Sequence, residues 1–153
     1  MRNHITGGCL CGAVRYQAKP PTLFCAHCHC GYCRRAHGAA FVTWFGVPEE
    51  AFQLSSGEDV VRWHESSKQS RRGFCTVCGT TLFFASTIAP GEMHVALATA
   101  DGPIDRAPQA HVFSDHRVPW IGIADELPCY TSDSEQLAKY RAVPGAPIPN
   151  TGD

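Results

Sequence analysis

The sequence lacks any large excess of charge, any long apolar run and any clear export signal. Its 153 residues carry 13 lysines and arginines against 14 aspartates and glutamates, a formal net charge of −1, which gives no reason to expect a nucleic-acid partner. No stretch is apolar over the ~20 residues that a membrane-spanning helix needs. The beginning, MRNHITGGC, has no hydrophobic segment of the kind that directs secretion. We therefore expect a cytoplasmic protein with no membrane partner.

Long helical patterns are also scarce, which leaves a chain of short strands. Val14, Tyr16 and Ala18 alternate with polar residues, as on a half-buried strand. The connections are too short for helical crossovers, so we expect a mainly β fold of antiparallel sheets with little helix. Helix is expected only as a turn over 34–37 and after Ser132, which forms a capping box with Glu135. The other expected strands cover 40–45, 52–54, 60–64, 80–85, 93–98 and 111–113.

The composition is that of an ordinary globular protein, with 44% hydrophobic and 18% charged residues. The length suits one domain with its own core. We assign residues 1–141 to this single domain. Residues 142–153 are rich in proline and glycine, and we expect them to form a loose C-terminal tail.

Cysteine is the abundant chemical feature, with nine residues. A disulfide framework would favour an even number of cysteines, an export signal and a shorter chain. The cytoplasm keeps thiols reduced. Clustered, reduced cysteines are best explained by metal binding.

Two short cysteine pairs, each followed by glycine, form the first candidate metal site. In Cys75-Thr-Val-Cys78-Gly79 both thiolates can reach one ion, and the glycine allows a tight turn. Structural zinc takes four ligands, and Cys9-Leu-Cys11-Gly12 supplies the other two. Such a site would contribute on the order of 10 kcal/mol to folding. The alternative is two unrelated pairs of buried thiols.

A second cluster, Cys28, Cys30 and Cys33, places three thiols in one short loop. Three thiolates around zinc leave one position open for an external ligand. An electron-rich thiolate set is better suited to binding and activating a soft thiol than to generating hydroxide. The alternative is that Cys25, His27 or His29 closes the site and makes it structural.

Basic residues flank both clusters. Arg34 and Arg35 follow Cys33, and Lys68, Arg71 and Arg72 precede Cys75. Arginine is suited to gripping the carboxylates of an anionic thiol peptide. The alternative role for these arginines is a solvated face or charge balance. His29 and His37 are candidates for a general base by proximity in the sequence. Cys25 and Cys28 also have the spacing of a redox pair.

Three cysteine motifs occur in an order that resembles a known family. They are Gly8-Cys-Leu-Cys-Gly-Ala-Val-Arg-Tyr16, then Cys28-His-Cys30 with Cys33-Arg-Arg35, then Phe74-Cys75 with Cys78-Gly-Thr80. Together with Pro108, His111-Val-Phe and Pro119-Trp120, they resemble the glutathione-dependent formaldehyde-activating enzyme family, which includes the centromere protein V type. The resemblance covers roughly residues 7 to 125.

The resemblance implies a GFA-type domain with the Mss4-like fold and two zinc ions. Cys9, Cys11, Cys75 and Cys78 would hold a structural ion, and Cys28, Cys30 and Cys33 an open one where glutathione sulfur binds. The implied activity is that of a carbon–sulfur lyase, acting through this zinc on glutathione or a similar thiol and a small aldehyde such as formaldehyde. The alternative function is a non-catalytic, zinc-stapled module that binds thiols or proteins. Cys25 and His29 depart from the family pattern, and the chain is shorter than the founding enzyme type.

Overall fold

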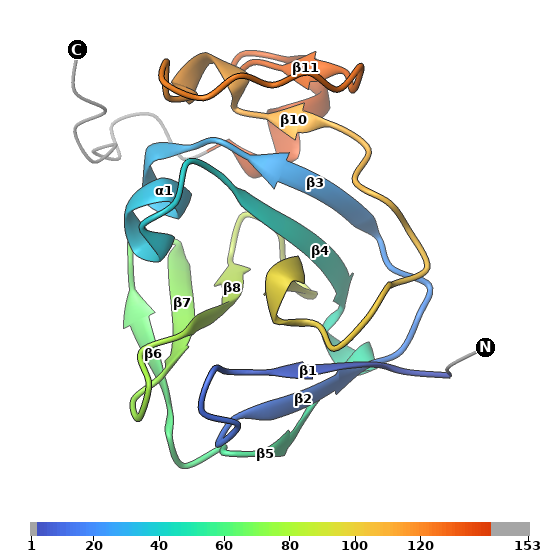
Figure 1. Ribbon diagram of the computed structural model, residues 1–153, viewed down its shortest axis with the longest axis vertical. Coiled ribbons are helices and arrows are strands. Elements are labelled where there is room, and N and C mark those ends of the chain that lie inside the picture. The colour runs from blue at the N-terminus through green and yellow to red at the C-terminus, as the bar shows by residue number, and fades with distance from the viewer. Residues whose placement is uncertain (1–2, 142–153) are drawn as a thin grey trace.

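The computed structural model describes residues 3–141, which fold into two β-sheets with little helix (Figure 1). The smaller sheet has the order β1-β2-β5, and the larger has the order β11-β10-β3-β4-β9-β8-β7-β6. The expected tail, 142–153, lies outside the described residues. The strands are β1 (Ile5–Gly8), β2 (Arg15–Ala18), β3 (Phe24–Cys28), β4 (Val42–Pro48), β5 (Phe52–Ser56), β6 (Val61–Glu65), β7 (Ser70–Cys75), β8 (Thr81–Ser86), β9 (Glu92–Ala96), β10 (His111–Val112) and β11 (Cys129–Tyr130).

The mainly β prediction is confirmed, and most expected strands are present. The antiparallel prediction holds throughout the small sheet and from β3 to β6 in the large one. The exceptions are β10, which pairs parallel with β3, and β11, which pairs parallel with β10. The long connection after β9 lets the chain return along the edge of β3 without a helical crossover.

Helical segments are short. The helix α1 (Gly31–His37) contains the expected turn and ends at Gly38 in the left-handed conformation. The remaining helices are 3-10 turns: η1 (Glu49–Ala51), η2 (Leu97–Thr99), η3 (Ser114–His116) and η4 (Glu135–Tyr140). Over residues 3–141, no helix combines the length and the hydropathy needed to cross a membrane.

The expected capping box at Ser132 is wrong. The residue that precedes η4 is Ser134, and its side chain makes no capping hydrogen bond. Ser132 instead donates its backbone N–H and its hydroxyl to the carboxylate of Asp115. Leu137 is buried, as the pattern predicted.

The main core lies between the two sheets and is built around aromatic rings. Tyr16 of the small sheet meets Phe83 of the large sheet edge-on, with ring centroids 5.7 Å apart, and Phe52 lies 5.1 Å from Phe83. Burying each such ring stabilises the fold by about 1.5–3 kcal/mol. A second, smaller core under α1 contains Cys28, Cys33, Val42, Trp44 and Ala96.

Candidate metal centres and the adjoining cavity

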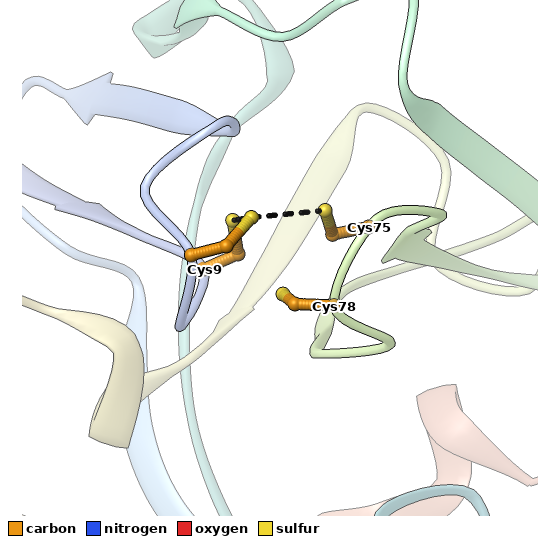
Figure 2. Close-up of side chains that lie close together, drawn as sticks. Cys9, Cys75 and Cys78 are labelled. Atoms are coloured by element: carbon orange, nitrogen blue, oxygen red, sulfur yellow. Dashed lines mark hydrogen bonds between the residues drawn. The ribbon is translucent and has the colours of Figure 1, made fainter.

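The four predicted thiols of the first site meet where the two sheets approach each other. Cys9 and Cys11 lie between β1 and β2, Cys75 ends β7, and Cys78 lies in the turn before β8. Their sulfur atoms are all within 4.8 Å of one another. Figure 2 shows the labelled side chains of Cys9, Cys75 and Cys78 pointing toward a common centre.

The sulfur separations fit a tetrahedral zinc site. The Cys9 and Cys11 sulfurs are 3.6 Å apart, and those of Cys11 and Cys75 are 3.9 Å apart. A zinc–sulfur bond of about 2.3 Å in tetrahedral geometry requires roughly 3.8 Å between sulfurs. The four residues therefore fit this metal.

The backbone turns that present these thiols depend on glycine. Gly12 and Gly79 have φ of 82° and 81°, a conformation that other residues rarely adopt. The Gly12 N–H donates to the Cys9 carbonyl at 3.1 Å, and the Gly79 N–H donates to the Cys75 carbonyl at 2.8 Å. These two observations explain why each cysteine pair is followed by glycine.

Local hydrogen bonds favour the thiolate form at two of these four residues, Cys9 and Cys78. The Val14 N–H donates to the Cys9 sulfur at 3.2 Å. The hydroxyl of Thr80 lies 3.2 Å from the Cys78 sulfur and accepts the N–H of Leu10 at 3.1 Å, so it connects the two turns. Hydrogen bonds from the Thr80 side chain and backbone lower the pKa of Cys78 to about 5.

The second predicted cluster also assembles, at the start of α1. The sulfurs of Cys28, Cys30 and Cys33 lie within 4.8 Å of one another. Cys30 is the N-cap residue, and its sulfur accepts the Cys33 N–H at 3.4 Å. Both terminal nitrogens of the buried Arg72 lie 3.7 Å from the Cys33 sulfur. The neighbouring thiols, and after them Arg72, hold the pKa of Cys33 well below its usual range.

The residues that were candidates to close this site lie elsewhere. His27 Nδ1 is 2.7 Å from the Thr43 hydroxyl, and His29 Nε2 is 2.8 Å from a nitrogen of His111. Cys25 is fully buried in the main core. Within residues 3–141, no fourth cysteine, histidine or carboxylate joins the three thiols.

The suggested redox pair of Cys25 and Cys28 does not form. The two residues are three apart on one strand, so their side chains point to opposite faces and their Cα atoms are roughly 10 Å apart. A disulfide needs Cα atoms within about 7 Å. All nine cysteines are free.

A cavity of about 780 Å³ opens beside the three thiols. This volume lies in the range of ligand-binding pockets, about 300–1,000 Å³. Its wall combines the thiol cluster with Arg72, aromatic rings and a few hydroxyl and amide groups. The lining includes Cys28, Cys30, Cys33, Trp44, Arg72, Phe84, His94, Phe113 and Tyr140.

Arg34, Arg35, His29 and His37 do not line this cavity. Arg34 is half-buried and Arg35 is exposed. His37 packs edge-on against Trp44, with ring centroids 5.2 Å apart. The predicted roles of these residues in carboxylate binding and proton transfer therefore gain no support from the cavity wall.

His94 is a cavity residue that the sequence analysis missed. Its Nε2 is 2.8 Å from Oε2 of Glu92, and both side chains are buried. Lys139 and the Tyr140 hydroxyl also donate to Glu92. Burial raises the pKa of Glu92, but these bonds outweigh it and lower it to about 2. The signal was Glu92-x-His94, a spacing that places two side chains on one face of a strand.

A sequence model described as glutathione-dependent formaldehyde-activating enzyme matches residues 4–116. The chain belongs to this family. Its resemblance to the family, stated above on three cysteine motifs, is confirmed. In this member of the glutathione-dependent formaldehyde-activating family, the two thiol clusters are the candidate metal sites.

Individual relatives agree with this assignment. An uncharacterized lyase from Schizosaccharomyces pombe is 38% identical over 89 residues, which cover 53% of this chain and 57% of that protein. A Halomonas elongata protein, provisionally named a glutathione-dependent formaldehyde-activating enzyme, is 23% identical over 156 residues, covering 90% and 94% of the two chains. A crystal structure of a Rhodobacter sphaeroides protein shares the fold, with a TM-score of 0.57 and 21% identity over 82% of this chain and 99% of that one.

Proposed function

We propose that this chain is a zinc-dependent carbon–sulfur lyase that acts on glutathione or a similar thiol and a small aldehyde. The observation that carries the proposal is the three-thiol cluster of Cys28, Cys30 and Cys33, which opens onto a cavity of about 780 Å³. Family membership and the names of two relatives support glutathione-related, lyase-type chemistry. The clustered thiols suit a reducing compartment, which supports a cytoplasmic location.

The two clusters have different parts in the proposal. Cys9, Cys11, Cys75 and Cys78 would hold a closed, structural zinc ion. Zinc bound by Cys28, Cys30 and Cys33 would leave one position for the substrate sulfur and favour its thiolate form. Two zinc ions per chain therefore form part of the proposal.

Residues of the cavity wall supply a positive charge and an apolar surface around the position of the substrate sulfur. Arg72 donates to Cys33 and would balance the negative charge of the zinc-bound thiolates. Trp44, Phe84 and Phe113 line the same cavity, and their apolar faces exclude water from the substrate. A buried cation in such surroundings acts more strongly than it would in bulk water.

The reaction moves one proton. A carbon–sulfur bond forms as the carbonyl π bond of the aldehyde breaks, and the thiol proton ends on the new hydroxyl oxygen. The reverse reaction moves that proton back to sulfur. His94, held by Glu92 at the cavity wall, is the residue that we propose for this transfer.

Calorimetric titration with glutathione, together with an assay for formaldehyde loss, tests the proposal. We expect binding with turnover in the zinc-loaded wild-type protein and in Cys129→Ser, a control that changes an exposed cysteine outside both clusters. Binding without turnover would overturn the enzyme assignment in favour of a thiol-binding module. Absence of binding to a protein with both clusters filled would overturn thiol chemistry altogether and favour a protein-interaction module.

A further inference from the structure

Two histidines from neighbouring strands lie side by side on the sheet face that turns away from the cavity. His111 of β10 pairs directly with His27 of β3, and paired positions place their side chains on the same face. The next residues along the two strands, Cys28 and Val112, line the cavity, whereas His27 and His111 do not. Successive side chains of a strand point to opposite faces. The histidine pair is therefore separate from the thiol cluster.

A carboxylate from a distant loop completes this group. Asp125 lies between η3 and β11, and its two oxygens are 2.9 Å and 3.0 Å from His111 Nε2. One ligand atom each of His27, His111 and Asp125 lies within 4.8 Å of the other two. Two imidazoles and one carboxylate thus converge from three separate segments.

Both imidazole rings are already oriented through their other nitrogen. His27 Nδ1 is hydrogen-bonded to the Thr43 hydroxyl at 2.7 Å, and His111 Nδ1 is bonded to His29 Nε2 at 2.8 Å. Metal-binding histidines in proteins generally have such a partner, which fixes the ring and its tautomer. The engaged Nδ1 atom of His27 leaves its Nε2 for a ligand, and His111 Nε2, which is hydrogen-bonded to Asp125, would exchange that bond for one to the ion.

We propose that His27, His111 and Asp125 form a third metal site, which takes a divalent transition ion such as Co²⁺, Ni²⁺, Fe²⁺ or Zn²⁺. Two imidazoles and a carboxylate are a donor set that such ions accept. Two ligand atoms at about 2.1 Å from an ion and at right angles are roughly 3.0 Å apart. The separations between His111 and Asp125 match this value.

Burial and charge separate this site from the thiol clusters. His111 is 1% exposed and holds a fixed position, while the Asp125 side chain is 43% exposed and gives an ion access from solvent. The set carries one negative charge and no sulfur, so it selects harder ions than three or four thiolates do. An ion here would fasten the segment that contains β10 and Asp125 to β3 (Figure 1). The site does not depend on any activity in the cavity.

Cobalt titration of the full chain, loaded with two equivalents of zinc for the thiol clusters and freed of excess zinc, tests this site. We expect wild-type protein to bind one equivalent of Co²⁺ by calorimetry, without the thiolate-to-cobalt absorption that a cysteine site would produce. Asp125→Asn should weaken this binding by more than about tenfold, the loss that even outer-shell changes cause. Glu126→Gln makes the same charge change on the adjacent exposed residue and should leave the affinity unchanged.

His27→Gln provides a second variant from a different strand and should also weaken cobalt binding by more than about tenfold. Zinc content and circular dichroism confirm that each variant is folded with its thiol clusters loaded. The proposal is overturned if wild-type protein takes up no cobalt, if all bound cobalt shows thiolate absorption, or if Asp125→Asn binds cobalt as tightly as wild type.

Discussion

Arg72 and Cys33 lie 39 residues apart in the sequence, yet both terminal nitrogens of the Arg72 guanidinium are 3.7 Å from the Cys33 sulfur. Arg72 is 5% exposed, and its guanidinium packs over the Phe84 ring at 4.9 Å. Among the residues that the structure describes, its Nε has no hydrogen-bond partner. The cavity therefore contains a buried cation whose two terminal nitrogens both face one thiol.

Replacing Arg72 with Met keeps most of the apolar stem and removes this cation. We expect the free energy of unfolding to fall by about 2 kcal/mol, the contribution of a charge-assisted hydrogen bond. Zinc should also be released at a higher pH, because Cys33 loses a group that favours its thiolate. A chromogenic chelator follows the release. The control is Arg71→Met, since Arg71 is exposed and stacks on Trp63. Coincident release curves for Arg72→Met and wild type would contradict the prediction.

Cys30→Ser separates metal binding from folding at the second cluster. Serine is a good N-cap residue, so α1 should form and the fold should persist. The loss of one thiol should remove the second zinc and the activity. Native mass spectrometry counts the zinc ions, with Cys129→Ser as the matched control. If Cys30→Ser keeps full zinc stoichiometry and any thiol-adduct activity, the assignment of this cluster is wrong.

Cys78→Ser should damage the fold itself. A four-thiolate zinc site contributes on the order of 10 kcal/mol, which is comparable to the whole stability of a typical domain, about 5–15 kcal/mol. We expect the cooperative thermal transition seen by near-ultraviolet circular dichroism to be lost. The same result is expected when a strong chelator removes zinc from wild-type protein. A Cys78→Ser protein that unfolds cooperatively at the wild-type temperature would rule out a structural metal here.

Glu92 should make stability fall in acid. Its pKa of about 2 in the folded state lies below the ordinary value of 4.5. Its contribution is therefore fully present above pH 4.5 and is lost as the pH falls through 2. The shift corresponds to about 3 kcal/mol. The free energy of unfolding, measured by urea titration between pH 6 and 2 at steps of about one pH unit, should fall less steeply with decreasing pH in Glu92→Gln than in wild type. Glu50→Gln, at an exposed position, should follow wild type; equal slopes for all three proteins would refute the prediction.

His94→Gln tests the proposed proton transfer. We expect kcat to fall by about 10²–10⁴-fold, with a smaller change in KM, and the pH profile of kcat to lose one limb. His64→Gln is the control, because His64 is exposed on β6. Unchanged kcat and an unchanged pH profile in His94→Gln would exclude this residue from proton transfer.

The two thiol clusters could be predicted because each is built from cysteines two or three residues apart, and glycine follows both pairs of the first cluster. Most strands could be predicted from alternation, as at Val14, Tyr16 and Ala18. The strand β3 could not, since its sequence, FCAHC, reads as part of a cysteine cluster. The parallel pairing of β10 depends on a long connection whose path no local pattern specifies.

The cavity residues escaped prediction for a related reason. Arg72 precedes Cys75 of the first cluster in the sequence, yet it contacts Cys33 of the second, 39 residues away. In the sequence His94 is one of several scattered histidines. Its place in the cavity wall depends on the position of β9 in the sheet. The Glu92-x-His94 spacing indicates a shared face of a strand, but it does not indicate which cavity that face lines.

The two cysteine pairs of the four-thiol site are synthesised at different times. Cys11 and Cys75 are 64 residues apart, so a ribosome that adds roughly 5–20 residues per second exposes the first pair about 3–13 s before the second. During that interval Cys9 and Cys11 form only half of a metal site. Under the proposed zinc assignment, these two thiols must stay reduced until β7 and the turn after it have emerged.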